Sequence, residues 1–276
     1  RTGGGHFEMV HLERLAEAKQ FLRQSRVACV LLDLTLADSS ALDGLIDLRN
    51  VAPEIPIVVV TADDDESRAV KAVQAGAQDY LIKDRMDSEQ LYRSVRYAIE
   101  RKRGELLLAH QALHDPLTGL PNRTLFVDRL TLALAQSERR TTAVAVLFLD
   151  LNDFKSVNDR FGHAAGDSVL RTVAGRLLSS MRPGDTVARF GGDEFTILSP
   201  EIARDPDAMT IAKRLTVAMA AGFEVADGAV ELSTSIGIAL ARGIDKKADA
   251  VVHLADEAMY RAKQQGHAYE LAVSDE

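Results

Sequence analysis

The sequence contains no tryptophan and only one cysteine among its 276 residues. A single cysteine excludes an internal disulfide and a zinc site built from several thiolates. Cys29 lies in the apolar run VACVLLD, where we expect it to fill the core. The sequence also lacks a secretory signal pattern and any apolar run near the roughly 18 residues typical of a membrane span. These absences predict a cytoplasmic protein without a transmembrane helix.

An excess of basic residues is missing as well. The 41 Asp and Glu residues outnumber the 33 Lys and Arg residues, which gives a net charge of −8. A general nucleic-acid or membrane-surface binder needs basic surface, so both classes are disfavoured. Acidic side chains can instead hold Mg²⁺ that carries the phosphates of a nucleotide. The length allows about two domains of roughly 100–200 residues each.

The first part of the chain alternates short apolar strands with amphipathic helices. Strands are predicted at residues 7–12, 27–33, 56–61 and 79–83, and helices at residues 13–24, 40–51 and 65–77. Such alternation is typical of an α/β fold with a parallel sheet covered by helices on both faces. Folds of this class bind ligands beyond the carboxyl ends of the strands.

Residues 88–113 form one long helical pattern, whose apolar stripe is broken by the charged segment ERKRGE. Because its heptads are few and imperfect, both a solvated helical linker and a dimeric coiled coil remain open. His110 and His114 are four residues apart, but HQALH lacks the glutamate of a zinc-protease motif. We expect both histidines on the helix surface.

The remaining part of the chain predicts a second α/β domain with a mixed sheet. Helices are predicted at residues 123–138, 169–181, 210–220 and 251–266, and strands at residues 141–150 and 230–240. The strand at 141–150 is apolar on both faces and is therefore expected at the centre of the sheet. The glycines of RFGGDEFTIL, residues 189–198, indicate a hairpin.

Three carboxylates are candidates for a metal site. Asp150 ends the central apolar strand, where an unpaired charge would be costly. Asp193 and Glu194 follow the two hairpin glycines. If the hairpin lies beside the strand, these acids form a hard-oxygen site suited to Mg²⁺ with bound substrate phosphates. For either motif taken alone, a turn with ordinary surface acids is the alternative.

Five motifs, in order and spacing, resemble those of the GGDEF-domain diguanylate cyclases. They are DPLTGLPNR (115–123), LDLNDFKSVNDRFGHAAGD (149–167), RFGGDEF (189–195), SIGIA (235–239) and ADEAMYRAK (255–263). The resemblance implies a palm-like fold, similar to that of nucleotidyl cyclases, and the condensation of two GTP molecules into cyclic di-GMP with release of pyrophosphate. It also implies a homodimer with one GTP on each subunit and Mg²⁺ or Mn²⁺ as cofactor.

The resemblance assigns roles to individual residues. Asp150, Asp193 and the Leu151 carbonyl match the metal ligands, and Glu194 matches the acid that binds metal or assists deprotonation. Substrate binding is implied for a further set: Asn158 and Asp167 at the guanine, Lys155 and Lys263 at the phosphates, and Phe154 and His163.

Local alternatives remain open for three of these residues. Asp167 matches an N-cap, Asn158 a turn residue and Lys155 a solvated surface residue. His267 and Ala268 stand where the family often has arginine and asparagine, and the lost guanidinium would weaken triphosphate binding without touching the metal site.

Arg182 and Asp185 in RPGD have the spacing of the family's inhibitory RxxD site. The resemblance implies that this arginine binds the guanine and phosphate groups of cyclic di-GMP, the reaction product. The alternative is a turn with a local ion pair.

Residues 6 to about 100 resemble a response-regulator receiver domain with a flavodoxin-like fold. The resemblance makes Asp33 the phosphoacceptor for a sensor histidine kinase, with Thr61 and Lys83 sensing the phosphoryl group. The first receiver strand and its acid pair have no counterpart among the predicted strands, so we expect this domain to be incomplete. The expected organisation is a receiver-like domain at 1–87, a helical linker at 88–113 and a cyclase domain at 114–276.

The leading hypothesis is a cyclase in a two-component signalling context. One alternative is a catalytically weak domain that serves as a GTP or cyclic di-GMP sensor. Another is a fragment of a larger GGDEF/phosphodiesterase protein. A nucleic-acid-binding output is disfavoured, because no basic helix or aromatic stacking surface stands out.

Overall fold

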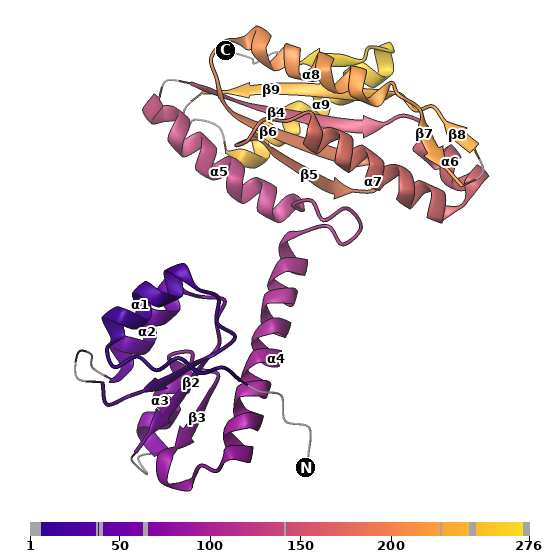
Figure 1. The fold of residues 1–276 in the computed structure, drawn as a ribbon. Helices are drawn as coiled ribbons and strands as arrows, with labels where there is room; N and C mark the ends of the chain where they lie inside the picture. The colour runs from indigo at the N-terminus through magenta and orange to yellow at the C-terminus, as the bar shows by residue number, and fades with distance from the viewer. Residues whose placement is uncertain are drawn as a thin grey trace. The chain divides into compact units, whose positions relative to one another are not determined.

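The computed structural model describes residues 7–36, 38, 41–62, 66–140, 142–226, 228–242 and 247–272. The chain divides into two compact units, Arg1–His110 and Gln111–Glu276, each with a hydrophobic core of its own (Figure 1). No helix among the described residues combines the length and the apolar character that crossing a bilayer requires.

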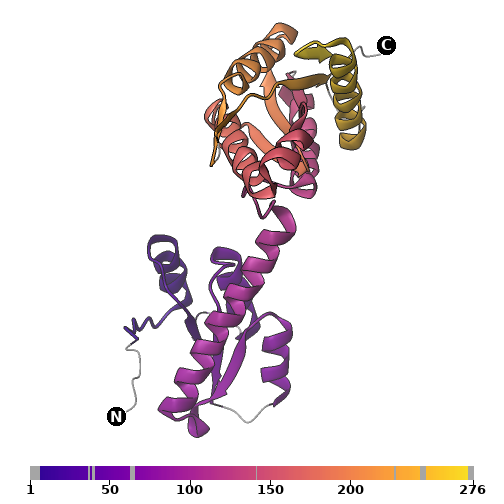
Figure 2. The ribbon, with the colours of Figure 1, turned by 90° about the vertical axis from the view of Figure 1, so that its right-hand side faces the viewer.

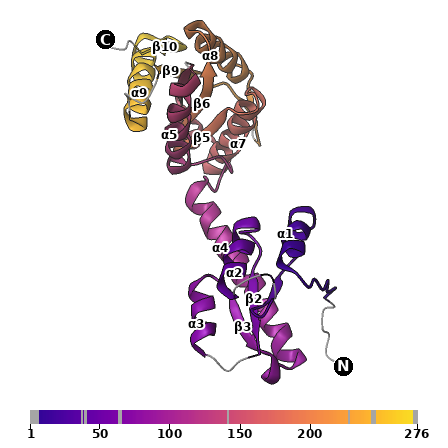
Figure 3. The same cartoon turned by 90° about the vertical axis from the view of Figure 1, so that its left-hand side faces the viewer.

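The first unit is a three-stranded parallel sheet with helices on both faces (Figures 1 and 3). Its strands lie in the order β1 (Val30–Asp33), β2 (Ile57–Thr61) and β3 (Asp79–Ile82). Its helices are α1 (Leu15–Gln24), α2 (Ala41–Val51), α3 (Glu66–Gln74), the short 3₁₀ helix η1 (Lys83–Arg85) and α4 (Ser88–Leu113).

The alternation of side chains along β2 explains these layers. Ile57 and Val59 lie in one core cluster with Leu45 and Leu48 of α2. Val58 is equally buried but points to the opposite face, where α4 lies (Figure 3). A strand buried on both faces has to be apolar throughout, as the run IVVVT is.

The predicted strand at residues 7–12 is wrong, since these residues form neither strand nor helix. No described strand pairs with residues 7–12, so no sheet hydrogen bonds satisfy their backbone groups. An apolar pattern alone does not make a strand without that partner. The other predicted elements of this unit are confirmed, and Gly76, with φ +100°, follows the end of α3.

The second unit is built on a mixed five-stranded sheet with the order β10-β9-β4-β6-β5 (Figures 1 and 2). The strands are β4 (Ala143–Leu151), β5 (Thr186–Gly191), β6 (Glu194–Ile202), β9 (Thr234–Ala241) and β10 (Tyr269–Leu271). The pair β9–β10 is parallel and the other pairs are antiparallel. The separate hairpin β7 (Phe223–Val225) and β8 (Gly228–Val230) completes the strands described here.

Helices cover both faces of this sheet. They are α5 (Arg123–Arg140), α6 (Phe154–Phe161), α7 (His163–Ser179), α8 (Asp205–Met219) and α9 (Ala248–Gln265). Leu147, Leu149 and Leu151 of β4 lie in a core with residues of α7 and α8. Val146 and Phe148 lie in the other core, with residues of α5 and α9. Asp150 continues this second series, so its carboxylate is on the α9 face at the end of the strand.

The central position of β4, the mixed sheet and the α/β class are confirmed: the chain combines a flavodoxin-like unit with a palm-like one. The predicted single strand at 230–240 is wrong in part. Residues 231–233 separate β8, which pairs with β7, from β9, which begins at Thr234 opposite Leu151. Pairing partners far away in the sequence decide where each of these strands begins and ends.

Candidate active site

The acids predicted from the strand and the hairpin come together. Asp150 and Glu194 are directly paired across β4 and β6, and Asp193 lies in the turn that precedes Glu194. Asp150 is 8% exposed, whereas Asp193 and Glu194 are half-buried. The hairpin therefore does lie beside the central strand, as the metal-site hypothesis requires.

The surroundings of the hairpin acids disfavour their charged forms. Burial, followed by the negative charge of Asp150, raises the pKa of Asp193 above its ordinary value. Burial also raises the pKa of Glu194, together with the carboxylates of Asp256 on α9 and of Asp150. A cluster of acids with this excess of negative charge would be stabilised by a cation.

Lys263 of α9 supplies one cation to the cluster. Its Nζ lies 2.5 Å from Oδ1 of Asp150, and this hydrogen bond raises the pKa of Lys263. Lys263, which the resemblance assigns to the phosphates, contacts a candidate metal ligand in the structure.

The donor set fits a magnesium-type ion. No three His, Cys, Asp or Glu side chains among the described residues converge as a ready metal-binding group. Mg²⁺, however, usually takes one or two carboxylates and completes its shell with carbonyl, water and phosphate oxygens. Asp150 and Asp193, with the main-chain carbonyl of Leu151, are hard-oxygen donors of this kind at one end of the sheet.

The candidate guanine-binding residues lie inside two helices. Asn158 is within α6 and Asp167 is within α7, so the alternative interpretations as a turn residue and an N-cap are wrong. The side chain of Asn158 lies against Gly166, where an added Cβ would overlap Oδ1 of the amide. Because residue 166 is a glycine, Asn158 can pack against it. This contact places Asn158 next to the start of the segment that carries Asp167.

The other predicted substrate residues differ in exposure. Lys155 and His163 are exposed on α6 and α7. Phe154 is packed in the core, so its side chain supports α6. Their substrate roles stay predictions.

Arg182 and Asp185 form the local ion pair that was the alternative to a product site. Nε of Arg182 lies 3.3 Å from Oδ1 of Asp185, and Nη2 donates to the carbonyl of Pro200 at 2.7 Å. The Asp185 side chain is 1% exposed and accepts a hydrogen bond from Ser199 Oγ at 2.8 Å. Only the arginine of the pair is open to solvent.

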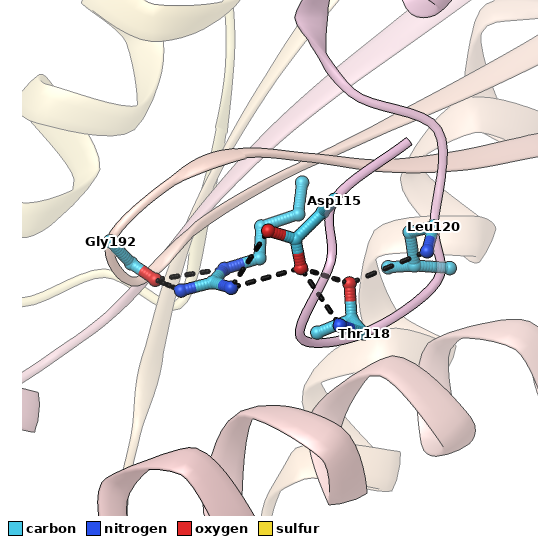
Figure 4. A network of polar contacts seen from close by, with 5 residues as sticks. Asp115, Thr118, Leu120 and Gly192 are labelled. Atoms are coloured by element: carbon cyan, nitrogen blue, oxygen red, sulfur yellow. Dashed lines mark hydrogen bonds and ion pairs between the residues drawn. The ribbon is translucent and has the colours of Figure 1, made fainter. Parts of the chain in front are cut away.

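A second charged pair joins the turn at 115–123 to the hairpin (Figure 4). Nη1 of Arg189 donates to both carboxylate oxygens of Asp115, at 2.9 and 3.1 Å. Nη2 and Nε of the same guanidinium donate to the carbonyl of Gly192 at 2.7 and 3.1 Å. Asp115 also accepts from the backbone N–H and the hydroxyl of Thr118. This network fixes the backbone immediately before Asp193.

Asp115 and Arg189 were not among the predicted site residues, although both belong to motifs shared with the GGDEF-domain cyclases. An acid and an arginine beside turn-forming glycines are common, and only the fold places them opposite each other. The position of Asp256 against Glu194 was missed for the same reason.

In the first unit, the three polar residues lie at adjacent strand ends. Asp33 ends β1, Thr61 ends β2, and Lys83 follows β3. Nζ of Lys83 lies 2.5 Å from Oδ2 of Asp33, and the Thr35 hydroxyl donates to Oδ1 at 2.8 Å. Burial raises the pKa of Asp33, but these hydrogen bonds outweigh it and hold the pKa below its ordinary value. Tyr80 of β3 is half-buried against the core of this unit.

Comparison with known proteins identifies the family of each unit. Residues 112–268 match the diguanylate cyclase GGDEF domain, and residues 5–96 match the response regulator receiver domain. The diguanylate cyclase TpbB of Pseudomonas aeruginosa is 47% identical over 159 residues, which are 57% of this chain and 37% of that protein. The response regulator PleD of Caulobacter vibrioides is 34% identical over 223 residues, 77% of this chain and 49% of that protein.

Solved structures are similar over the same region. The isolated GGDEF domain of TpbB is 44% identical with a TM-score of 0.56, over 58% of this chain and 94% of that one. The coiled coil and GGDEF domain of DgcB from Caulobacter crescentus, in complex with c-di-GMP, is 28% identical with a TM-score of 0.58, over 67% of this chain and 98% of that one. The chain spans half or less of the length of the curated relatives named above. The chain belongs to the diguanylate cyclase GGDEF domain family, with a receiver domain ahead of the GGDEF domain.

Proposed function

We propose that this chain is a diguanylate cyclase, which joins two GTP molecules into cyclic di-GMP as a homodimer. The observation that carries the proposal is the meeting of Asp150, Asp193 and Glu194 at one end of the central strands of a GGDEF domain. The arrangement of Asn158 against the helix that carries Asp167 supports a purine-reading site.

In this reaction the 3′-oxygen of each GTP attacks the α-phosphorus of the other. Two phosphodiester bonds form, the bonds to two pyrophosphate groups break, and each hydroxyl loses a proton. A divalent ion held by Asp150, Asp193 and the Leu151 carbonyl supplies positive charge at the phosphates when bound and eases ionisation of the hydroxyl.

The side chains around the ion complete the chemistry. The Lys263 ammonium contacts Asp150 here, and it would be in position to bind a phosphate oxygen if Asp150 held a metal ion. The Asp167 carboxylate accepts hydrogen bonds from N1–H and N2–H of guanine, and the Asn158 amide meets the remaining base edge. Lys155, exposed on α6, adds charge for the phosphates.

The test is incubation of the purified chain with GTP and Mg²⁺, with chromatographic detection of cyclic di-GMP. Asp193→Ala removes a proposed metal ligand, and Glu138→Ala removes an exposed acid of α5 as the matched control. We expect product from the parent and the control, and a loss of at least ~100-fold in Asp193→Ala. Equal rates in all three proteins would contradict the assigned site.

The second candidate function is a catalytically weak sensor of GTP or cyclic di-GMP. It is favoured by the residues that lie beside Lys263. His267 and Ala268 line a cavity of about 310 Å³ together with Lys263. An imidazole reaches fewer phosphate oxygens than a guanidinium fork does. Binding of GTP without turnover by the parent protein would select the sensor over the cyclase.

Product inhibition at Arg182 is a further part of the proposal. The exposed guanidinium can leave its ion pair to bind a guanine or phosphate group, while buried Asp185 stays on Ser199. Arg182→Ala is expected to weaken cyclic di-GMP binding by at least ~10-fold in calorimetry and to leave the initial rate unchanged. Unchanged binding in this variant would place the product elsewhere.

Control by the receiver domain completes the proposal. A sensor histidine kinase would phosphorylate Asp33, and Lys83 would then contact the phosphoryl group. Incubation with radiolabelled acetyl phosphate is expected to label the parent and not Asp33→Asn. An equally labelled variant would remove Asp33 from this role.

A further inference from the structure

Hydrogen bonds of one residue, Asn152, connect the turn after β4 to the segment where β9 begins. Its backbone N–H donates to the carbonyl of Ser233 at 2.9 Å. Its Nδ2 donates to Oγ of Ser233 at 2.9 Å, and its Oδ1 accepts from Oγ of Ser235 at 3.1 Å. The amide therefore uses a donor and an acceptor at once, on two residues of the neighbouring chain segment.

These hydrogen bonds lie next to the proposed metal ligands. Asn152 directly follows Asp150 and Leu151, which pair with Ser235 and Thr234 across β4 and β9. Ser235 belongs to the same face of the sheet as Asp150, because directly paired residues point to one side. The hydrogen bonds of Asn152 thus hold the chain immediately after the proposed metal ligands.

The backbone after Asn152 turns sharply into α6. Asp153 adopts a left-handed conformation with φ +59°, which costs free energy for a residue other than glycine. α6 begins at the next residue and carries Lys155 and Asn158. A strained junction between metal ligands and substrate-binding residues needs an external restraint to keep one geometry, and Asn152 supplies it.

We propose that Asn152 is a positioning residue for the cyclase reaction, which rests on the proposed function. Through Ser233 and Ser235 it sets the direction of the Leu151 carbonyl and the start of α6, so that metal and nucleotide are held together. It also forms one wall of the cavity lined by Lys263 and His267. Residues that orient metal ligands in this way typically change metal affinity or activity by ~10–100-fold when removed.

Two substitutions at Asn152 separate positioning from charge. Asn152→Ala removes both side-chain hydrogen bonds. Asn152→Asp keeps both, since the hydroxyls of Ser233 and Ser235 can each donate to a carboxylate, and it adds one negative charge near Asp150. Thr216→Ala is the matched control, because Thr216 lines the same cavity but bonds only to the Ala212 carbonyl of its own helix at 3.0 Å.

The experiment measures binding of 3′-deoxy-GTP with Mn²⁺ by calorimetry, beside kcat, KM and the Mg²⁺ concentration for half-maximal rate. This nucleotide lacks the attacking hydroxyl, so binding is read without turnover. We expect Asn152→Ala to weaken binding and kcat/KM by about 10-fold with little change in thermal midpoint, and Asn152→Asp to restore both to within about 3-fold. Ser235→Ala should also weaken nucleotide binding and kcat/KM. If Asn152→Ala does not fold, Ser235→Ala is used in its place.

The outcomes test the positioning role of Asn152 separately from the cyclase function. Parent-like binding and rate in Asn152→Ala, or equal losses in Asn152→Ala and Thr216→Ala, would overturn the role of Asn152 and leave the cyclase function standing. Failure of Asn152→Asp to restore binding would overturn it as well. If the parent binds 3′-deoxy-GTP but makes no cyclic di-GMP, the binding differences alone decide on Asn152. A parent that neither binds nor reacts overturns both proposals.

Discussion

At the scale of single residues, the contact between Asn158 and Gly166 has no room for a methyl group. A Cβ on Gly166 would overlap the Asn158 amide and come near the ring of Phe154. Gly166→Ala is therefore expected to displace the Asn158 side chain from its place against residue 166 and to raise the KM for GTP by about 10-fold, the loss of about one hydrogen bond to the base. Steady-state kinetics over a range of GTP concentrations measures this effect.

Gly175 offers the matched control for that substitution. It lies in the same helix, and a Cβ there would meet no atom within 4 Å. Gly175→Ala should leave the KM unchanged and stabilise the helix by ~1 kcal/mol, because alanine has the higher helix propensity. Equal KM values for both variants would show that Asn158 does not need its present position.

Cys29 gives a prediction on thiol chemistry. Burial raises its pKa to about 11, and the backbone hydrogen bonds that stabilise the thiolate only partly offset this. At pH 8 only ~1 in 1,000 molecules then carries the reactive thiolate, far fewer than for a free cysteine of pKa about 8.5. Alkylation by iodoacetamide, followed by mass spectrometry, should be at least ~100-fold slower in the native protein than in urea. Similar rates in both conditions would contradict the buried environment of the thiol.

The chemistry of single residues could be predicted wherever it followed strand ends. Asp150 was found because a carboxylate ends an apolar strand, and Asp193 and Glu194 because they follow paired glycines. Asn152 could not be assigned in this way, because its side chain bonds to Ser233 and Ser235. Asp115 and Arg189 could not be assigned either, because they bond to each other. Such partners lie at sequence separations that no local pattern encodes.

At the scale of elements, the pair Asp115–Arg189 holds the turn at 115–123 against the β5–β6 hairpin. Burial raises the pKa of Asp115, but hydrogen bonds from Thr118 and Arg189 outweigh it, and the pKa lies below its ordinary value. A carboxyl with a lowered pKa contributes stability above its unfolded pKa of about 3.9, and that contribution is lost as the pH falls through the folded value.

Asp115→Asn should therefore lower the free energy of unfolding by ~1–3 kcal/mol at pH 7. Urea unfolding at a series of pH values should show the difference from the parent beginning to shrink as the pH falls below about 4 and disappearing only below the folded-state pKa, where the parent carboxyl is protonated too. A difference that stays constant across this range would mean that the charge of Asp115 contributes nothing. Because the pair precedes Asp193, the variant should also lose cyclase activity.

The packing of α9 on β9 depends on another glycine. A Cβ on Gly237 would overlap the carbonyl oxygen of Ala255 and the nitrogen of Met259, which are backbone atoms and cannot move aside alone. Gly237→Ala is expected to cost ~1–3 kcal/mol or more by forcing the helix away from the sheet. Urea unfolding measures the loss, and Gly222→Ala, whose Cβ would make only an ordinary contact with the Val230 carbonyl, is the control. A parent-like Gly237→Ala would show that α9 has freedom to shift.

Helices and central strands could be predicted because their periodicity is local. The pattern at 88–113 coincides with α4, and the run at 141–150 ends one residue before β4 does. The short elements α6, β7 and β10 were missed, since they comprise eight, three and three residues and depend on neighbours for their backbone bonds. The strand predicted at 7–12 failed for the same reason, as its partner is not among the described strands.

At the scale of the whole molecule, the reaction proposed above would require two copies of the chain. In that mechanism each site would hold one GTP, and each 3′-hydroxyl would have to reach the α-phosphate of the other GTP, so a single copy would not complete cyclic di-GMP. The exposed apolar residues of α4 are the feature of the chain that suits such pairing. They are Tyr97, Leu106, Leu107, Leu108 and Leu113.

Leu106 and Leu113 are seven residues apart on α4, the spacing of one heptad in a coiled coil. Changing both to lysine places like charges in any seam between two α4 helices, so we expect a monomer that forms cyclic di-GMP at least ~10-fold more slowly at low protein concentration. Light scattering gives the mass, and the rate should recover as the protein concentration rises. Leu132→Lys, at an exposed leucine of α5, should keep the parent's mass and rate. A double variant with the mass and activity of the parent would show that the two copies meet through another surface, and α4 would then be a solvated linker.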